Sequence, residues 1–171
     1  MWNSSKAMFP ILATALHLIC SMHPASAATA DAAAKPARLI ASGSDGQPTS
    51  LTDGRGRTAL VIFWSPESLA SRKSLHELQR FAAATENKGI FLLAVSTSLD
   101  RNKVLAFMTE RKLSFPYAFR GEDDFGAVDE QRLPIVLVFD TEGKLLRQHA
   151  GMFHQKILRR LIDPEAATGV R

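Results

Sequence analysis

The stretch that decides the fold is residues 59–75, which read Ala-Leu-Val-Ile-Phe-Trp-Ser-Pro-Glu-Ser-Leu-Ala-Ser-Arg-Lys-Ser-Leu. Its first six residues are all apolar and rich in β-branched and aromatic side chains, which is typical of a strand buried on both faces. From Leu69 to Asn87 the apolar residues instead recur at helical spacing, and Gly89 follows as a stop signal. The stretch therefore predicts a central strand followed directly by an amphipathic helix.

A second strand and a second helix follow along the chain. Residues 90–95 are again wholly apolar, as expected of a second buried strand, and residues 100–112 predict a helix with Val104, Leu105 and Met108 facing inward. Two such strands with a helix between them form a β-α-β unit with parallel strands.

The C-terminal part of the chain has a different pattern. An apolar run at 135–139 is separated from Leu145-Leu146 by a turn segment containing Gly143, which predicts a β-hairpin. Residues 154–162 have helical spacing and form a closing helix.

Two additions surround this core. Residues 39–40 and 49–51 flank an Asp45-Gly46 turn and predict an N-terminal hairpin, and residues 115–129 form a central insertion with a short strand. The predicted fold class is therefore α/β, with a central mixed sheet flanked by helices, an N-terminal hairpin and a central insertion.

The N-terminal end is typical of an export signal. Residues 1–6 are short and positively charged, residues 7–22 are almost wholly apolar, and Ala25-Ser26-Ala27 offers the small side chains that signal peptidase accepts. We expect residues 1–27 to be a signal peptide, cleaved before Ala28, and the protein to be periplasmic or secreted.

Two alternatives for the N-terminal end remain open. A retained membrane anchor would have an apolar run shorter than the roughly 20 residues that span a bilayer. A lipoprotein would need a small residue before Cys20, where Ile19 stands. After cleavage we expect no stable membrane span.

The remaining chain divides into a linker, one domain and a tail. Residues 28–38 are an Ala-rich linker, residues 39–163 have the length of a single domain, and residues 164–171 form a C-terminal tail. The full sequence has 21 basic and 17 acidic residues, and they are interspersed, so we expect no nucleic-acid partner. Cys20, the only cysteine, lies in the predicted signal, which leaves the exported chain without a disulfide or a redox pair.

Several segments, in order and at matched spacing, resemble the TlpA/ResA-like family of exported thioredoxins. Residues 63–75 align without a gap with that family's active-site run, Phe-Trp-Ala-Thr-Trp-Cys-Gly-Pro-Cys-Arg-Lys-Glu-Leu. Asp45-Gly46-Gln47-Pro48, Leu133-Pro134 and residues 139–144 match other landmarks of the family. The resemblance covers about residues 39–163 and implies the thioredoxin fold.

In this alignment Ser68 and Ser71 occupy the places of the two redox cysteines, and Glu67 replaces a tryptophan. The family's chemistry needs a thiolate at a helix N-terminus and a second thiol one turn away. Serine supports neither step, so we expect Ser68 to be a helix N-cap instead. A serine nucleophile would require a neighbouring base; His76 is too far along the helix, whereas His149 and His154 stay open.

The resemblance also implies that Pro134 follows a cis peptide bond, beside which an extended substrate peptide pairs with the backbone. It therefore predicts a binding groove around the degenerate redox positions. Its predicted residues are Trp64, Ser65, Glu67, Ser68, Ser71, Leu133 and Pro134.

A copper site is the weaker possibility. His149, Met152 and His154 offer imidazole and thioether ligands, which suit copper. Their spacing fits no closed metal site, so we expect neither a metal nor another cofactor.

The leading functional hypothesis is a redox-inert binding, chaperone-like or assembly module in the periplasm, with a protein or an extended peptide as its partner. The alternatives are an oxidoreductase-related protein that acts only through a partner's cysteines, and a periplasmic copper-handling protein.

Overall fold

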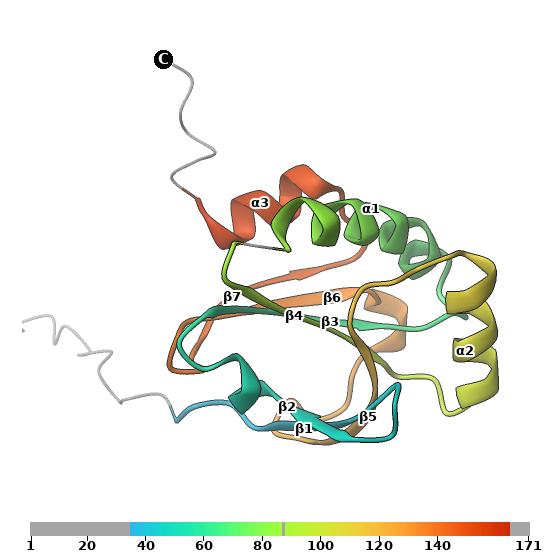
Figure 1. The fold of residues 1–171 in the computed structure, drawn as a ribbon, viewed down its shortest axis with the longest axis horizontal. Coiled ribbons are helices and arrows are strands. Elements are labelled where there is room, and N and C mark those ends of the chain that lie inside the picture. The colour runs from blue at the N-terminus through green and yellow to red at the C-terminus, as the bar shows by residue number, and fades with distance from the viewer. Residues whose placement is uncertain (1–34, 87, 165–171) are drawn as a thin grey trace, which may run out of the picture. The chain divides into compact units, whose positions relative to one another are not determined.

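The computed structural model describes residues 35–86 and 88–164, which form a seven-stranded mixed sheet with three α-helices (Figure 1). The predicted signal peptide, most of the predicted linker and nearly all of the C-terminal tail lie outside the described residues. The elements in chain order are β1 (Leu39–Gly43), β2 (Pro48–Ser50), the 3-10 helix η1 (Leu51–Gly54), β3 (Thr58–Trp64), α1 (Leu69–Thr85), β4 (Ile90–Ser96), α2 (Arg101–Glu110), β5 (Tyr117–Asp123), the 3-10 helix η2 (Glu130–Arg132), β6 (Ile135–Phe139), β7 (Leu145–Ala150) and α3 (Gln155–Ile162).

The strands lie in the order β2-β1-β5-β4-β3-β6-β7. β3 pairs parallel with β4 and antiparallel with β6, and β6 pairs antiparallel with β7. This order confirms the predicted β-α-β unit and the predicted C-terminal hairpin. It also places β3 in the interior of the sheet, as its apolar sequence indicated.

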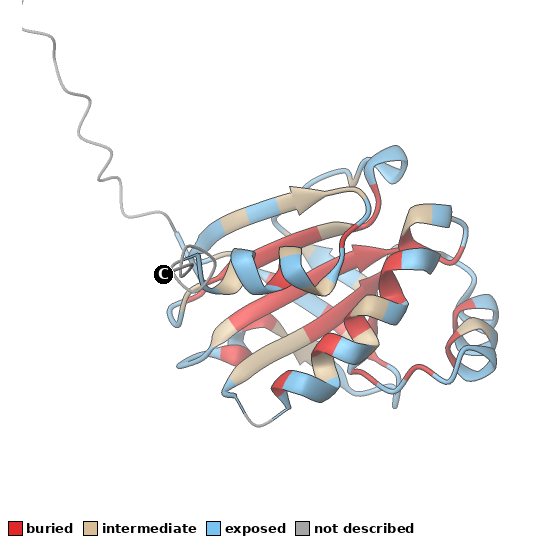
Figure 2. Ribbon diagram, turned by 90° about the horizontal axis from the view of Figure 1, so that it is seen from above, coloured by how far each residue is buried: buried red, intermediate tan, exposed pale blue. Residues whose placement is uncertain are grey.

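Alternate residues of β3 enter two separate hydrophobic clusters, one on each face of the sheet. Leu60, Ile62 and Trp64 pack in the cluster that contains the buried residues of α1, α2 and α3. Val61 and Phe63 pack in the other cluster, against residues of β1 and η1. Figure 2 shows the buried residues running along the central strands, and Figure 1 shows α1 and α3 side by side over one face.

The predicted N-terminal hairpin is present and adds two strands to the sheet. Ile40 pairs with Ser50 across β1 and β2, and Gly46 has a φ of +82° in the turn between them. β1 then pairs antiparallel with β5 of the predicted insertion. The contact is so close at Gly121 that a Cβ there would lie 2.5 Å from the carbonyl oxygen of Ile40.

Three local expectations were wrong. Leu105 is 40% exposed, because α2 turns inward only the face that carries Val104 and Met108. α1 ends at Thr85, before Asn87. The first half of β4 is only half-buried, because β5 begins beside Ala94 and leaves the earlier residues without a neighbouring strand on that side.

Within residues 35–86 and 88–164, no helix is both long enough and apolar enough to cross a bilayer.

Candidate functional site

Ser68 lies at the start of α1, where β3 and the helix are joined. Its backbone is extended, with φ −77° and ψ 120°, and its Oγ accepts a hydrogen bond from the N–H of Ser71 at 3.2 Å. This confirms the predicted N-cap. The same hydroxyl donates to the carbonyl oxygen of Leu133 at 3.2 Å. Ser68 therefore joins the helix start to the segment that leads into β6.

Ser71 is wholly buried and makes a structural contact. Its Oγ accepts a hydrogen bond from the backbone N–H of Ser65 at 3.4 Å, and Ser65 is itself only 5% exposed. Ser65, Glu67, Ser68, Ser71 and Leu133 are called the Ser68 network below. The two serines differ in access, because only Ser68 reaches the surface.

Glu67 is the charged member of the Ser68 network. The Ser65 hydroxyl donates to its carboxylate, and the Nζ of Lys103 lies 2.7 Å from its Oε1. The hydroxyl of Ser98 also donates to Oε1, at 3.3 Å. The carboxylate thus connects the start of α1 to α2 and to the loop before it.

Two opposing effects act on the pKa of Glu67. Burial raises it, but hydrogen bonds from Lys103, from Ser65 and from the backbone, together with the charge of Lys103, outweigh burial and lower the pKa to about 2. Glu67 is therefore a fixed anion beside Ser68. A thiolate formed at position 68 would face this negative charge.

Pro134 directly precedes β6, the second strand of the site. The Leu133–Pro134 peptide bond is cis. The N–H of Gly151 donates to the carbonyl oxygens of Pro134, at 2.8 Å, and of Arg132, at 3.0 Å. These bonds hold the start of β6 against the end of β7.

Most of the predicted groove residues do not reach the surface. Glu67 and Ser68 are at least partly exposed, whereas the other predicted residues, Trp64, Ser65, Ser71, Leu133 and Pro134, are buried. Their buried side chains support the site from below and cannot contact a bound partner directly.

Trp64, one of the predicted groove residues, is fully buried. Its side chain is 0% exposed, and its ring centroid lies 5.7 Å from that of Phe107 in α2. The reason is the period of two along β3, which puts Trp64 on the same face as Leu60 and Ile62, under the helices. Its Nε1 has no hydrogen-bond partner among the described residues.

Three exposed apolar side chains lie close in sequence to residues of the network or to residues bonded to it, and the sequence analysis named only one of them, Met152, as a possible copper ligand. Leu69 is 57% exposed and follows Ser68 directly. Met152 is 48% exposed and follows Gly151, which is bonded to Pro134. Leu99 is 99% exposed. The only sequence signal for these exposed side chains was a single apolar residue after a turn residue. That pattern is too common to predict a binding surface by itself.

The structure provides no base for Ser68. Among the described residues, no histidine lies within hydrogen-bond distance of its hydroxyl, and the Nε2 of His149 contacts the carbonyl oxygen of Met152 at 3.2 Å. His154 is the N-cap residue of α3. No group of three or more His, Cys, Asp or Glu side chains gathers within residues 35–86 and 88–164 in a way that could hold a metal ion.

Comparison with known families and structures places the fold. A family model described as Redoxin matches residues 28–163. No curated protein matches the sequence significantly.

Three solved structures illustrate the likeness. A putative thiol:disulfide interchange protein DsbE from Chlorobium tepidum is 24% identical, with a TM-score of 0.65 over 77% of this chain and 94% of that one. StoA from Bacillus subtilis is 20% identical, with a TM-score of 0.60 over 74% and 96%. A secreted thiol-disulfide isomerase from Corynebacterium glutamicum is 16% identical, with a TM-score of 0.65 over 75% and 83%.

These likenesses, together with the strand order, show that the domain has the thioredoxin-like fold. The thioredoxin fold that the resemblance implied is confirmed. The single cysteine, Cys20, is consistent with loss of the paired-cysteine motif.

Proposed function

The chain belongs to the Redoxin family, and from that premise we propose that it is a redox-inert member that binds an extended polypeptide outside the cytoplasm. The observation that carries the proposal is the state of Ser68 and Ser71, which stand in the redox positions of the alignment. One caps α1 and bonds to Leu133, and the other is buried against Ser65.

The absence of cysteine supports the redox-inert part of the proposal. Cys20 is the only cysteine of the sequence, and it precedes the whole matched region. Thiol-disulfide exchange requires a thiolate that attacks a disulfide sulfur, and residues 28–171 contain none. Ser68 cannot replace it by nucleophilic catalysis, because no histidine reaches its hydroxyl among the described residues.

The surface around Ser68 supports the binding part. Leu69 and Met152 present apolar side chains to solvent next to the Ser68 network and next to Pro134. Glu67 adds a fixed negative charge, partly balanced by Lys103. A partner segment with an apolar side chain beside a polar backbone would cover Leu69 and exchange hydrogen bonds with this network.

Export follows from the N-terminal sequence. Residues 1–27 have the charge, apolar run and small residues of a cleaved signal. The intact mass of the secreted protein tests this part, because cleavage before Ala28 removes Cys20 and leaves no thiol to label. A mass that includes residues 1–27 would contradict it.

The binding experiment uses reduced α-lactalbumin, which stays unfolded without its disulfides, as the probe. We expect saturable binding by the secreted protein and a loss of at least about tenfold for Leu69→Asp, because a buried unpaired charge at a contact is costly. Leu146→Asp is the matched control, since Leu146 is 47% exposed on β7. Equal losses in both variants, or no binding by the unaltered protein, would refute the proposed surface.

A redox experiment tests the inert state separately. The secreted protein should not reduce insulin disulfides, whereas the double variant Ser68→Cys with Ser71→Cys should gain activity, because the new pair spans one helical turn. Each single variant should only trap mixed disulfides. Insulin reduction by the unaltered protein would overturn the proposal.

A further inference from the structure

β4 is paired along its whole length on one side only. Its residues from Ile90 to Ser96 pair with β3, whereas only Ala94 to Ser96 pair with β5. The first half of β4 therefore has an open edge, although the strand lies in the interior of the sheet.

The residues just before β5, Ser114 to Pro116, explain why the pairing between β4 and β5 stops at Ala94. The N–H of Ala94 donates to the carbonyl oxygen of Pro116 at 3.0 Å, and the period of two turns the N–H and C=O of Leu92 to the same side. The next donor to Leu92 would be Pro116, which has no N–H. The next acceptor would be the carbonyl oxygen of Ser114, but no hydrogen bond joins it to Leu92 among the described residues. Gln79 instead fixes Ser114 through the N–H and the hydroxyl of that residue, at 2.7 and 2.9 Å. Among the described residues, the N–H and C=O of Leu92 therefore have no backbone hydrogen-bond partner on this side of β4.

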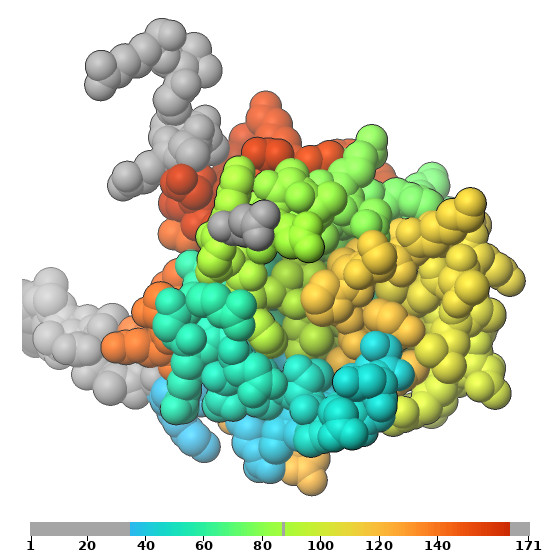
Figure 3. Space-filling view, in the orientation of Figure 1, coloured from blue at the N-terminus to red at the C-terminus, as the bar shows by residue number. Residues whose placement is uncertain are grey.

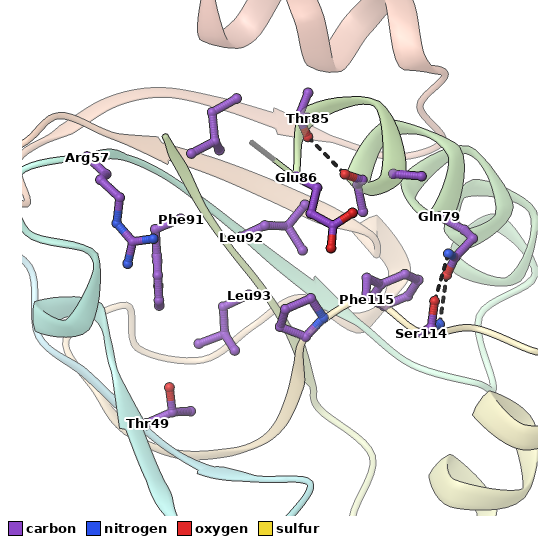
Figure 4. A pocket seen from close by; sticks show the side chains of 14 residues that line it. Thr49, Arg57, Gln79, Thr85, Glu86, Phe91, Leu92, Leu93, Ser114 and Phe115 are labelled. Atoms are coloured by element: carbon purple, nitrogen blue, oxygen red, sulfur yellow. Dashed lines mark hydrogen bonds between the residues drawn. The ribbon is translucent and has the colours of Figure 1, made fainter. Parts of the chain in front are cut away.

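A cavity of about 530 Å³ lies along this open edge (Figure 4). Its volume is within the range of about 300–1,000 Å³ that is usual for binding sites. In Figure 3 the surface of β4 lies between the teal residues that precede β3 and the gold residues that lead into β5. Residues that line it include Arg57, Ala83, Glu86, Leu92, Phe115 and Pro116, and they define what is called the β4 slot.

The β4 slot has two chemically different walls, because neighbouring residues of β4 point to opposite faces of the sheet. Leu92 packs with the cluster under α1, on the side of Ala83 and Glu86. Phe91 packs with the opposite cluster, and the guanidinium of Arg57 lies 5.3 Å from its ring centroid. The slot therefore has a helix wall with a carboxylate and an opposite wall with a cation.

Neither charge of the slot has an ion-pair partner in the part of the chain that the structure describes. Arg57 donates to the carbonyl oxygen of Asp53 at 2.8 Å, but it forms no ion pair with a described residue, and neither does Glu86. An occupant with alternating charge would complement both walls at once.

We propose that the β4 slot binds an extended peptide segment of a partner protein, which adds to β4 as a strand. The backbone of the segment pairs with Leu92, acidic side chains face Arg57, and apolar or basic side chains face Ala83 and Glu86. Strand addition at an exposed edge is a common mode of peptide recognition, in which the backbone provides affinity and alternate side chains provide specificity. The site is separate from the surface around Ser68, so it does not depend on the function proposed above.

The probe is a capped peptide, Val-Asp-Lys-Asp-Val-Thr, which places its two aspartates on one face and its lysine on the other. Amide hydrogen exchange on the full secreted protein measures the pairing. At a peptide concentration ten times the Kd, exchange of the Leu92 N–H should slow about tenfold. The N–H of Leu93, which points toward β3, should not change and is an internal control.

Two N-methylated forms of the probe separate a strand from any other bound form. One carries methyl groups on the amides of Lys and the second Val, the other on the amides of both Asp residues. Because only alternate amides of a strand face its neighbour, one form should lose binding and the other should keep it. Equal binding by both forms would overturn the strand, since side chains alone would then hold the peptide.

Protein variants locate the binding. Ala83→Trp should fill the slot and weaken binding more than tenfold, whereas Ala84→Trp on the same exposed helix surface, outside the slot, should leave it unchanged. Arg57→Gln should weaken binding about threefold to fivefold, as expected for a partly exposed ion pair. Thermal melts of the variants confirm that each is folded. Equal effects of the two tryptophan variants, or no saturable binding of any probe, would refute the site.

Discussion

The start of α1 and the open edge of β4 differ in whether their backbone polar groups have hydrogen-bond partners. At the helix start, Ser68 and Ser71 provide hydroxyl acceptors for backbone N–H groups, and Ser68 donates to Leu133. At the strand edge, Pro116 has no N–H for Leu92, and Ser114 bonds to Gln79 through its N–H and hydroxyl while its carbonyl oxygen accepts no bond from Leu92 among the described residues. In the first region side-chain hydroxyls satisfy the backbone groups, whereas in the second a backbone donor and acceptor have no partner among residues 35–86 and 88–164.

This difference indicates which part of the domain has backbone groups that are free to bind a partner. Ser68 and Ser71, which align with the redox cysteines, stabilise the helix start, because their hydroxyls already form hydrogen bonds within the domain. The unused hydrogen-bonding capacity lies at the other end of α1. A free backbone group at an otherwise paired strand is unusual, because most buried or half-buried backbone groups find partners.

The largest expected effect tests whether one side of β4 is free. Proline at position 93 should remove a ladder hydrogen bond to β3, whereas proline at position 92 should remove only a free N–H. Because Leu93 is more buried than Leu92, each proline variant is compared with alanine at the same position. The excess cost of proline over alanine should be about 2 kcal/mol larger at position 93. Urea unfolding measures it, and equal excess costs would mean that Leu92 has a partner.

An intermediate effect concerns the closed region. Ser68→Ala removes the N-cap and the bond to Leu133, and it should lower the free energy of unfolding by about 1–2 kcal/mol. Ser68→Thr keeps both the acceptor and the donor and should recover most of that loss. If the alanine and threonine variants were equally stable, the hydroxyl would not hold the helix start.

Ser71→Ala provides a weaker test of the same region. It leaves the buried N–H of Ser65 without its acceptor, but the 3.4 Å separation indicates a long bond. We expect a loss of about 1 kcal/mol in urea unfolding. A stability gain would show that Ser65 finds another partner.

The smallest effect is the acid dependence set by Glu67. Its folded pKa is lowered from 4.5 to about 2, so its contribution to stability is present above pH 4.5 and is lost as the pH falls toward 2. Lys103→Met should raise that pKa and lower stability at neutral pH by less than about 1 kcal/mol, because the pair is partly exposed. The variant and the unaltered protein should converge near pH 2. A constant difference across this window would exclude the ion pair as its cause.

Much of the fold could be predicted because its signals are local. The apolar run of β3 predicts a strand that is buried on both faces, and the helical spacing after it predicts a helix that is buried on one face. The structure has both elements. The N-cap at Ser68 follows from the residue type and its place before the helix. The burial of five of the seven predicted groove residues could not be predicted from such local signals, because it depends on how distant elements pack together.

The amino-acid sequence alone determined that residues 28–171 contain no thiol, that serines stand at both redox positions of the alignment, and that β3 is central. These properties depend on residue identity and on short-range periodicity. Only the tertiary structure decided that Trp64 faces the helices, that Lys103 reaches Glu67, and that β5 pairs with half of β4. Each of these contacts joins segments far apart in the chain, and their relative position follows from the packing of whole elements, which no local pattern records.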